Sequence, residues 1–368
     1  FSLRRPEFKT LRTLIAEARE LDDAGGELRI NRHQAGLFSE LESLAASVHT
    51  TARWDAQVRS LLELVEGLED AEESAEKGTE KASDKGAQDS AIPQKASRQV
   101  IAQRPVPAGL QATLRHYQVE GFQWLAFLYE HRLGGILADD MGLGKTVQAL
   151  ALLAHALEEH RAASEDAAER SESVEPFAPF LVVAPTSVIA NWAAEAERFL
   201  PEAKVVTITE TTAGKTPLAE RIAGAHLVLT SYTLLRMDED AYTGYARTLG
   251  DTVDDSTGEQ SAPEGWGALL LDEAQFVKNT GTRAWSIART MPARTKIAMT
   301  GTPIENNLME LWALLAIVAD GLFPSARAFR DLYARPAESG EDPAHAAATA
   351  ARLRRRIRPL MLRRTKEL

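Results

Sequence analysis

Residues 139–146, with the sequence Asp-Asp-Met-Gly-Leu-Gly-Lys-Thr, combine the side chains that bind phosphate. Gly142 and Gly144 allow backbone amides to turn toward phosphate oxygens. Lys145 adds a positive point charge, and the hydroxyl of Thr146 suits a magnesium ion. We therefore expect a phosphate-binding loop that holds a nucleotide together with Mg²⁺.

The flanking sequence supports this interpretation. An apolar run at 135–138 precedes the loop, and an Ala/Leu-rich helical pattern at 147–157 follows it. Strand, glycine loop and helix, in that order, are the context that such a loop requires. Asp139 stands where the general pattern has its first glycine. A second Gly-Lys-Thr at 214–216 lacks the preceding glycine loop, so we interpret it as an ordinary loop.

Two adjacent carboxylates supply the acids that phosphoryl transfer needs. Asp272 and Glu273 directly follow an apolar run at 268–271, and Gln275 lies two residues further on. Asp272 would hold the magnesium ion through water, and Glu273 would position or deprotonate the attacking water. A solvated acidic turn is the alternative for this segment alone, and its pairing with the phosphate loop favours catalysis.

Six short apolar runs alternate with helical patterns and must position these residues. Such runs, bounded by turns and separated by helices, are typical of a parallel sheet covered by helices on both faces. We therefore expect a doubly wound α/β domain. A further apolar run at 311–319 predicts a buried helix and is too short to span a bilayer. The six runs are residues 135–138, 180–184, 205–208, 227–230, 268–271 and 296–299.

The rest of the chain predicts additional parts. Residues 1–68 contain three amphipathic patterns and are expected to form a small helical module. Residues 69–105 have almost no large apolar side chains, which predicts an acidic flexible linker. We place the α/β domain at 106–350 and a basic segment at 351–368, whose arginines suit a DNA-facing or lobe-joining role or a solvated helix face.

Charge is distributed unevenly along the 368 residues. The net charge of −11 taken alone argues against a polyanionic partner. Residues 63–89, 158–175 and 238–264 carry −7, −5 and −7, however, which leaves about +8 for the remainder and permits phosphate contact. We interpret the second and third of these segments as surface insertions. The sequence has no cysteine, which excludes disulfides, and its eight histidines show no zinc-ligand spacing.

Taken together, these motifs resemble the first lobe of helicase superfamily 2, most closely its Swi/Snf-like branch of double-stranded-DNA translocases. The resemblance covers about residues 110–366, and it rests on the order and spacing of several segments. These are Leu114–Gln118 with Gly121–Leu125, Asp139–Thr146, Ala184–Thr186 with Asn191–Trp192, Asp272–Gln275, Thr300–Pro303 with Asn306, and Met361–Lys366.

The resemblance implies a RecA-like fold that binds ATP and Mg²⁺. Gln118 is similar to the family's adenine-sensing glutamine, with a polar position on an amphipathic helix as the alternative. Met141 and Leu143 belong to the nucleotide loop. A segment that couples nucleotide state to lobe movement is implied at Thr300, Gly301 and Thr302, where a helix start is the alternative.

For the whole protein, the resemblance implies a DNA-dependent ATPase that translocates along duplex DNA and remodels protein–DNA complexes. Thr186, Thr230 and Ser231 resemble contacts to the phosphate backbone, with turn formation as the alternative. DNA-bound proteins such as RNA polymerase or nucleoid proteins are expected partners. We expect a cytoplasmic, nucleoid-associated protein without a membrane partner, and the N-terminal module resembles accessory regions of bacterial members.

Hydrolysis also needs an arginine on the transition state, which in this family comes from a second RecA-like lobe in cis. We therefore expect the chain to be part of a longer protein, to bind Mg-ATP or ADP weakly and to hydrolyse ATP poorly by itself. One alternative is the lobe of an RNA helicase, for which Asp-Glu-Ala-Gln at 272–275 is atypical. The other is a nonhydrolytic nucleotide-sensing interaction module, against which the intact Lys145 and Glu273 argue.

Overall fold

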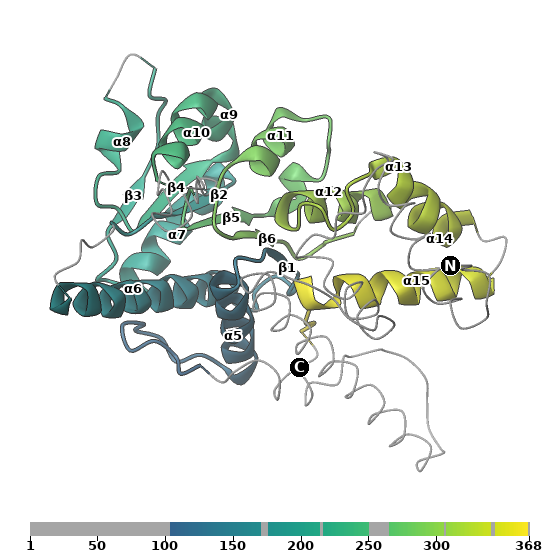
Figure 1. Cartoon of the computed structure of the whole chain (residues 1–368), viewed down its shortest axis with the longest axis horizontal. Coiled ribbons are helices and arrows are strands. Elements are labelled where there is room, and N and C mark those ends of the chain that lie inside the picture. Colours follow the sequence, from purple (N-terminus) through teal and green to yellow (C-terminus); the bar gives the residue numbers. More distant parts are fainter. Residues whose placement is uncertain are drawn as a thin grey trace, which may run out of the picture. The chain divides into compact units, whose positions relative to one another are not determined.

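The computed structural model describes residues 104–170, 176–213, 216–249, 265–304, 307–339 and 343–366 (Figure 1). These residues belong to two compact units, which are described separately. The larger unit comprises 105–320 with 360–368, and residues 321–359 belong to the other. The expected helical module and nearly all of the expected linker lie outside the described residues. The domain limits given above stay predictions.

A seven-stranded sheet forms the centre of the larger unit. Its strands are all parallel, in the order β3-β4-β2-β5-β6-β1-β7. Six of them lie on the six apolar runs, which confirms the expected parallel α/β architecture. The short β7 was not predicted. The strands are β1 Gly135–Leu137, β2 Phe180–Ala184, β3 Val205–Thr207, β4 Leu227–Ser231, β5 Ala268–Asp272, β6 Lys296–Met299 and β7 Met361–Leu362.

The central strands are buried along their whole length because helices cover both faces of the sheet. Every residue of β2, β4 and β5 is buried. Leu181 on β2 pairs with Val228 on β4 and with Leu269 on β5, so apolar side chains stack across the sheet. Because the strands are parallel, their carboxyl ends meet at one edge, where ligands bind in folds of this kind.

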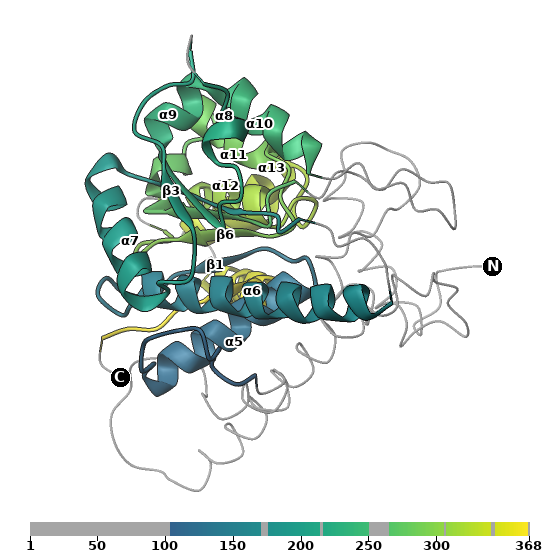
Figure 2. The ribbon, with the colours of Figure 1, turned by 90° about the vertical axis from the view of Figure 1, so that its left-hand side faces the viewer.

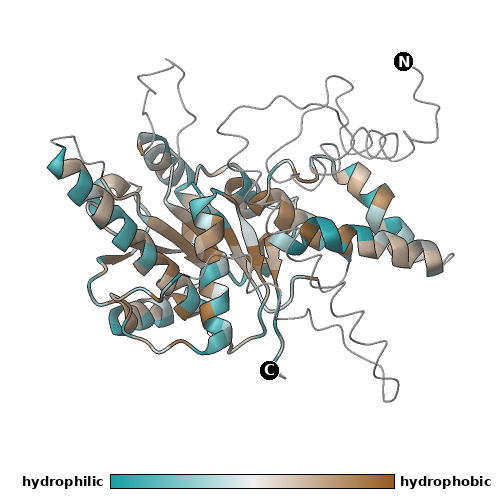
Figure 3. Cartoon of the chain, turned by 60° about the horizontal axis from the view of Figure 1, so that its bottom comes forward, coloured by the Kyte–Doolittle hydropathy of each residue, from teal (hydrophilic) through white to brown (hydrophobic). Residues whose placement is uncertain are grey.

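Helices lie on both sides of the sheet (Figure 2), with α5, α6 and α7 on one side and α9, α11 and α12 on the other. Hydrophobic residues concentrate on the strands and on the inward faces of these helices (Figure 3). The elements of this unit are α5 His116–Glu130, α6 Lys145–Glu169, α7 Thr186–Phe199, α8 Leu218–Arg221, α9 Tyr232–Met237, α10 Glu239–Thr248, the 3₁₀ helix η3 Ala274–Val277, α11 Arg283–Thr290 and α12 Leu308–Val318.

Two expectations about the helices have different outcomes. The predicted buried helix at 311–319 is confirmed by α12, which is buried from Leu311 to Val318. The acidic segment at 158–175 does not interrupt the helical pattern, because α6 continues to Glu169 with mostly exposed side chains. Its Ala, Glu and Arg residues are good helix formers, so polarity alone did not end the helix. None of the described helices is long and apolar enough to cross a bilayer.

The smaller unit is helical where it is described. Its aromatic centre is formed by Phe323, Phe329 and Tyr333, whose ring centroids lie 5.0–5.6 Å apart. The guanidinium of Arg352 lies 5.1 Å from the ring of Tyr333. The basic C-terminal residues are therefore divided between the two units, because Arg364 follows β7 in the larger one. The elements are α13 Ala326–Phe329, the π-helix η4 Arg330–Ala334, α14 Arg335–Ser339, α15 Pro343–Ile357 and the 3₁₀ turn η5 Arg358–Leu360.

Candidate nucleotide-binding site

The phosphate-binding loop lies between β1 and α6, as predicted from the strand, loop and helix pattern. Gly142 and Gly144 have φ angles of 87° and 78°, in the left-handed region that favours glycine. At Gly144 an added Cβ would also lie 2.4 Å from Nε2 of Gln118. Both positions therefore need glycine, and their conformation places the positive end of α6 at the loop.

The ammonium group of Lys145 lies between the loop and the acid pair. Its Nζ donates hydrogen bonds to the main-chain oxygens of Asp139 at 2.6 Å and Asp140 at 3.3 Å. Burial lowers the pKa of Lys145, while the carboxylates of Asp139, Glu273 and Asp272 oppose this effect. The loop carbonyls thus hold the cation at the point where a bound phosphate would need it.

The other predicted nucleotide-binding residues surround the loop. Met141 is exposed, Leu143 is buried, and Thr146 is half-buried in the first turn of α6. Gln118 on α5 accepts a hydrogen bond through Oε1 from the amide of Arg115 at 2.9 Å. Its Nε2 donates to the main-chain oxygen of Leu143 at 3.2 Å. The predicted adenine-sensing glutamine is therefore beside the loop, with both ends of its amide already bonded to backbone.

Asp272 ends β5 at the same edge of the sheet. Its Oδ2 accepts a hydrogen bond from Nε1 of Trp192 at 2.8 Å, and its Oδ1 accepts one from the amide of Glu273 at 3.0 Å. Burial raises the pKa of Asp272, although the hydrogen bond from Trp192 lowers it. Within the described ranges, neither carboxylate oxygen forms an ion pair, so its charge is available to a cation.

A series of hydrogen bonds leads from the second acid to the predicted coupling segment. Nε2 of Gln275 donates to Oε2 of Glu273 at 2.8 Å, and Oγ1 of Thr300 donates to Oε1 of Gln275 at 3.3 Å. The amide of Thr302 then donates to Oγ1 of Thr300 at 3.1 Å. Gly301 faces the phosphate loop, where an added Cβ would lie 3.3 Å from a loop side chain. The structure thus brings the acid pair, the glutamine and the coupling segment together.

The three predicted nucleic-acid contacts lie at the carboxyl ends of β2 and β4, but their side chains differ in access. Thr186 is exposed at the start of α7. Thr230 is fully buried, and its hydroxyl lies 2.7 Å from that of Tyr242. Ser231 caps α9 by accepting a hydrogen bond from the amide of Leu234 at 3.1 Å. The hydroxyls of Thr230 and Ser231 are therefore engaged within the lobe, which leaves Thr186 as the accessible one.

The donor set fits a nucleotide with Mg²⁺. The loop presents left-handed glycines and a lysine, which suit phosphate oxygens. The Thr146 hydroxyl and the Asp272 carboxylate are oxygen ligands of the kind that Mg²⁺ prefers. Asp272 also carries a buried charge that forms no ion pair in the described part of the chain, although the nearby Lys145 favours its ionised form, so a divalent cation would relieve the cost of its burial.

Comparison with known proteins agrees with this geometry. Residues 117–368 match the model of the SNF2-related domain. The chain belongs to this family. The chain is 36% identical over 274 aligned residues to the chromatin-remodeling ATPase INO80 of Arabidopsis thaliana, covering 71% of this chain and 16% of that protein. It is 35% identical over 271 residues to the helicase ssl-1 of Caenorhabditis elegans, covering 72% of this chain and 10% of that protein.

A solved structure shares the fold of this SNF2-related chain. The SWI2/SNF2 ATPase core of Sulfolobus solfataricus, in complex with double-stranded DNA, has 30% sequence identity and a TM-score of 0.54. The similarity covers 71% of this chain and 46% of that one. The expected Swi/Snf-like fold is therefore confirmed. The chain spans less than one fifth of the length of the two curated relatives above.

Two buried residues hold the SNF2-related site in ways that the sequence did not indicate. Trp192 belongs to a segment that carried the resemblance, but its bond to Asp272 was not predicted. A buried indole N–H usually has an acceptor, which was the available signal. Arg364 is buried and pairs with Asp139, so the alternative of a solvated helix face is wrong for this residue. Asp139, a charged residue directly after the buried run at 135–138, was the signal that such a partner exists.

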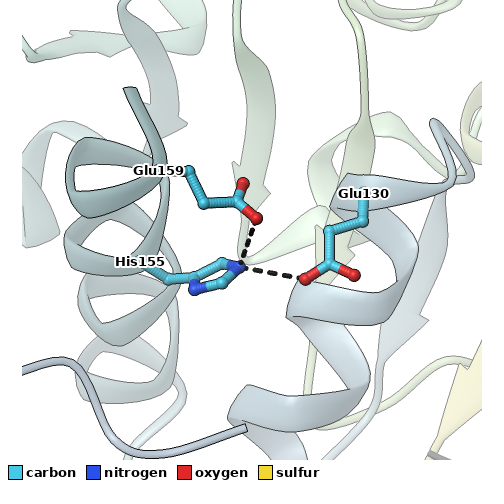
Figure 4. Close-up of side chains that lie close together, drawn as sticks. All are labelled: Glu130, His155 and Glu159. Carbon is cyan, nitrogen blue, oxygen red and sulfur yellow. Dashed lines mark hydrogen bonds and ion pairs between the residues drawn. The ribbon is translucent and has the colours of Figure 1, made fainter. Parts of the chain in front are cut away.

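A separate ion-pair cluster joins α5 to α6 (Figure 4). Nε2 of His155 lies 3.1 Å from Oε1 of Glu130 and 3.3 Å from Oε1 of Glu159. Burial lowers the pKa of His155, but the hydrogen bonds to both glutamates outweigh it and raise the pKa to about 9. The three ligand-type atoms lie within 4.8 Å of one another. Because a protonated imidazole satisfies both carboxylates, we interpret this cluster as a link between helices and not as a metal site.

Proposed function

We propose that the larger unit is the ATP-binding lobe of a DNA-dependent ATPase that translocates on double-stranded DNA and remodels protein–DNA complexes. One observation carries this proposal. Lys145 and the Asp272–Glu273 pair converge at one edge of the sheet, and Asp272 has only neutral hydrogen-bond donors among the described residues. Relatives named as a chromatin-remodeling ATPase and a helicase support the same activity.

Binding of the nucleotide divides between two groups of residues. The amides of the loop, including those of Gly142 and Gly144, would bind phosphate oxygens with Lys145. Gln118 would bind the adenine edge by exchanging its present backbone contacts for contacts to the base. Met141 and Leu143 would shape the loop around the phosphates. These roles follow from the position of each side chain beside the loop.

The acid pair would carry the chemistry. Thr146 and Asp272 would hold Mg²⁺, which neutralises charge that develops on the phosphates. Glu273 would accept a proton from the attacking water, and Gln275 would orient its carboxylate through the 2.8 Å hydrogen bond. Thr300, Gly301 and Thr302 would transmit the state of this site, because Thr300 is bonded directly to Gln275.

DNA would lie at the carboxyl ends of β2 and β4. Thr186 would contact the phosphate backbone through its exposed hydroxyl, and the Thr230–Ser231 segment would contribute through its backbone. Such contacts position a duplex without reading its sequence. The similar SWI2/SNF2 core of Sulfolobus solfataricus was solved in complex with double-stranded DNA, which supports this placement.

Several parts of the proposal concern the whole protein. A second RecA-like lobe in cis would supply the arginine for the transition state, so this chain alone should hydrolyse ATP slowly. The N-terminal region would serve as a bacterial-type accessory module. DNA-bound proteins such as RNA polymerase or nucleoid proteins would be partners at the cytoplasmic nucleoid.

The experiment measures ATP hydrolysis by a protein that carries this lobe and a second lobe, with duplex DNA, single-stranded DNA or RNA. Duplex DNA should stimulate most, and Lys145→Ala should abolish turnover. Lys204→Ala, at an exposed lysine before β3, is the matched control and should remain active. Stimulation by RNA alone would favour an RNA helicase. Nucleotide binding without turnover on any polymer would favour a nucleotide-sensing module.

A further inference from the structure

The guanidinium of Arg364 is buried at the base of the phosphate-binding loop. Only 8% of the residue is exposed. Its Nε donates to Oδ1 of Asp139 at 2.9 Å, and its Nη2 bonds to Oδ2 of the same carboxylate. Nη2 also donates to Oε1 of Gln148 at 2.7 Å, and Nη1 donates to the main-chain oxygen of Tyr117. One side chain thus joins the loop, α6 and α5.

The backbone around Arg364 runs alongside the same loop. The amide of Ala138 donates to the main-chain oxygen of Leu362 at 2.7 Å, and the amide of Asp140 donates to that of Arg364 at 3.0 Å. The amide of Lys366 then donates to Oδ2 of Asp140 at 3.2 Å. Segment 361–366 is therefore bonded to the chain on both sides of Asp139.

Each partner of Arg364 is either bonded directly to a residue of the nucleotide site or adjacent to one in the chain. The carbonyl of Asp139 accepts from Lys145, and Tyr117 precedes Gln118 in the chain. Nε2 of Gln148 donates to the main-chain oxygen of Gly144 at 3.2 Å. We propose that Arg364 is a positioning residue for the phosphate-binding loop, through which segment 361–366 and the nucleotide site are coupled. This inference rests on the proposed nucleotide binding.

The energetics of the contact favour a positioning role. A buried ion pair costs desolvation, and apolar side chains of similar volume often stabilise a fold equally well. The bidentate geometry instead fixes direction, because the guanidinium fork donates two hydrogen bonds to the carboxylate oxygens in one plane. It fixes the start of the loop at Asp139, where the general motif has a flexible glycine. Orientation of the loop is therefore what this pair adds beyond packing.

The neighbouring helix leaves space for this network. At Gly121 on α5, an added Cβ would lie 1.7 Å from Oε1 of Gln148 and 2.6 Å from Nη2 of Arg364. These atoms are the ends of flexible side chains, so an alanine would displace the two polar groups and leave the backbone in place. Gly121→Ala therefore tests the network without removing either charge.

The coupling follows from the shared contacts. A nucleotide that orders the loop would also stabilise the bonds of Asp139 and Asp140 to segment 361–366. Linkage requires the reverse effect of equal size, so a change in that segment alters nucleotide affinity. Segment 361–366 would then report the state of the nucleotide site to whatever part of the protein it contacts.

The test uses the 368-residue chain and a fluorescent ADP derivative. Arg364→Lys keeps the charge but loses the fork, and it should weaken ADP binding about tenfold. Gly121→Ala should weaken it in the same direction. Arg363→Lys, at the exposed neighbouring arginine, is the matched control and should bind within about twofold of the unchanged chain.

Hydrogen exchange separates positioning from general destabilisation. ADP should slow amide exchange in residues 361–366 about fivefold in the unchanged chain and in Arg363→Lys, but not in Arg364→Lys. Normal ADP affinity in folded Arg364→Lys and Gly121→Ala variants would overturn the positioning role alone. Absence of ADP binding by the unchanged chain would overturn the nucleotide site as well. If Arg364→Lys does not fold, Gly121→Ala provides the same comparison.

Discussion

Asp139 and Asp272 are both buried carboxylates next to the carboxyl ends of parallel strands, yet their surroundings differ. Asp139 is 0% exposed and bonds through both oxygens to the guanidinium of Arg364. Asp272 is 7% exposed and bonds to the neutral indole of Trp192 and to a backbone amide. The charge of one acid is neutralised within the lobe, and the charge of the other is not.

This difference separates an acid that holds the fold from an acid that serves a ligand. A buried charge is costly unless it is paired. At Asp139 the charge of Arg364 compensates for that cost. At Asp272 no ion pair does so among the described residues, and burial raises the pKa of the carboxyl. Functional sites commonly give up stability in this way. Substitutions of the two acids should therefore change the free energy of unfolding in opposite directions.

The largest effect on stability is expected at the paired acid. Asp139→Asn should lower the free energy of unfolding by about 3–5 kcal/mol, because the guanidinium of Arg364 stays buried without a counter-charge. Urea denaturation of the chain measures this change. Asp320→Asn is the control, since that aspartate is 70% exposed and pairs with Arg289 at 3.4 Å. The control substitution should lower the free energy of unfolding by less than about 1 kcal/mol. Equal losses in the two variants would contradict the assignment of Asp139 as the acid that holds the fold.

The second effect concerns metal binding at the unpaired acid. In the unchanged chain, Mg²⁺ should strengthen ATP binding about tenfold or more, because Asp272 provides a carboxylate for the ion. Asp272→Asn should remove this enhancement while keeping the metal-free affinity. Titrations of a slowly hydrolysed ATP analogue with and without Mg²⁺ measure the ratio. An unchanged ratio in Asp272→Asn would place the metal elsewhere.

The third effect has the opposite sign from the first. Without Mg²⁺, Asp272→Asn should raise the free energy of unfolding by about 1 kcal/mol at neutral pH, because it removes a buried charge. The pKa of Asp272 is raised in the folded chain. Ionisation of this carboxyl therefore lowers the free energy of unfolding as the pH rises through that folded pKa. Below the ordinary pKa near 3.8, the variant and the unchanged chain should have the same free energy of unfolding. Destabilisation at neutral pH would show that Asp272 is also a structural acid.

The smallest effect is expected at the more exposed cluster of Glu130, His155 and Glu159. Glu130→Gln should lower stability by about 0.5–1 kcal/mol at pH 6. The folded pKa of His155 is about 9 and its ordinary value is 6.5. The stabilisation is therefore complete below pH 6.5 and is lost as the pH rises through 9. Melting temperatures at pH 6 and pH 10 measure this, and a difference that persists at pH 10 would argue against the ion pair.

Much of the site could be predicted because its signals are local. The left-handed glycines lie within a few residues of Lys145, and Asp272 ends a strand that is otherwise apolar. Six of the seven strands lie on continuous apolar runs, since burial on both faces removes polar positions. The two-residue β7 had no such signal, because Met361 and Leu362 are too few to show a pattern.

The predictions of nucleic-acid contact were less complete. Thr230 and Ser231 have the small hydroxyls that suit phosphate contact, but whether a hydroxyl is free depends on its neighbours. Tyr242 lies 12 residues from Thr230 and binds its hydroxyl inside the lobe. Ser231 forms a helix cap, which agrees with the turn-forming alternative. Their contact to DNA stays a prediction.

The sequence by itself determined the phosphate loop, the acid pair and the parallel α/β architecture, because each depends on residues close together in the chain. Only the tertiary structure decided which charges are paired. Arg364 reaches Asp139 across 225 residues, and Trp192 reaches Asp272 across 80. The cost of a buried charge depends on which groups packing brings beside it, and spacing along the chain does not contain that information.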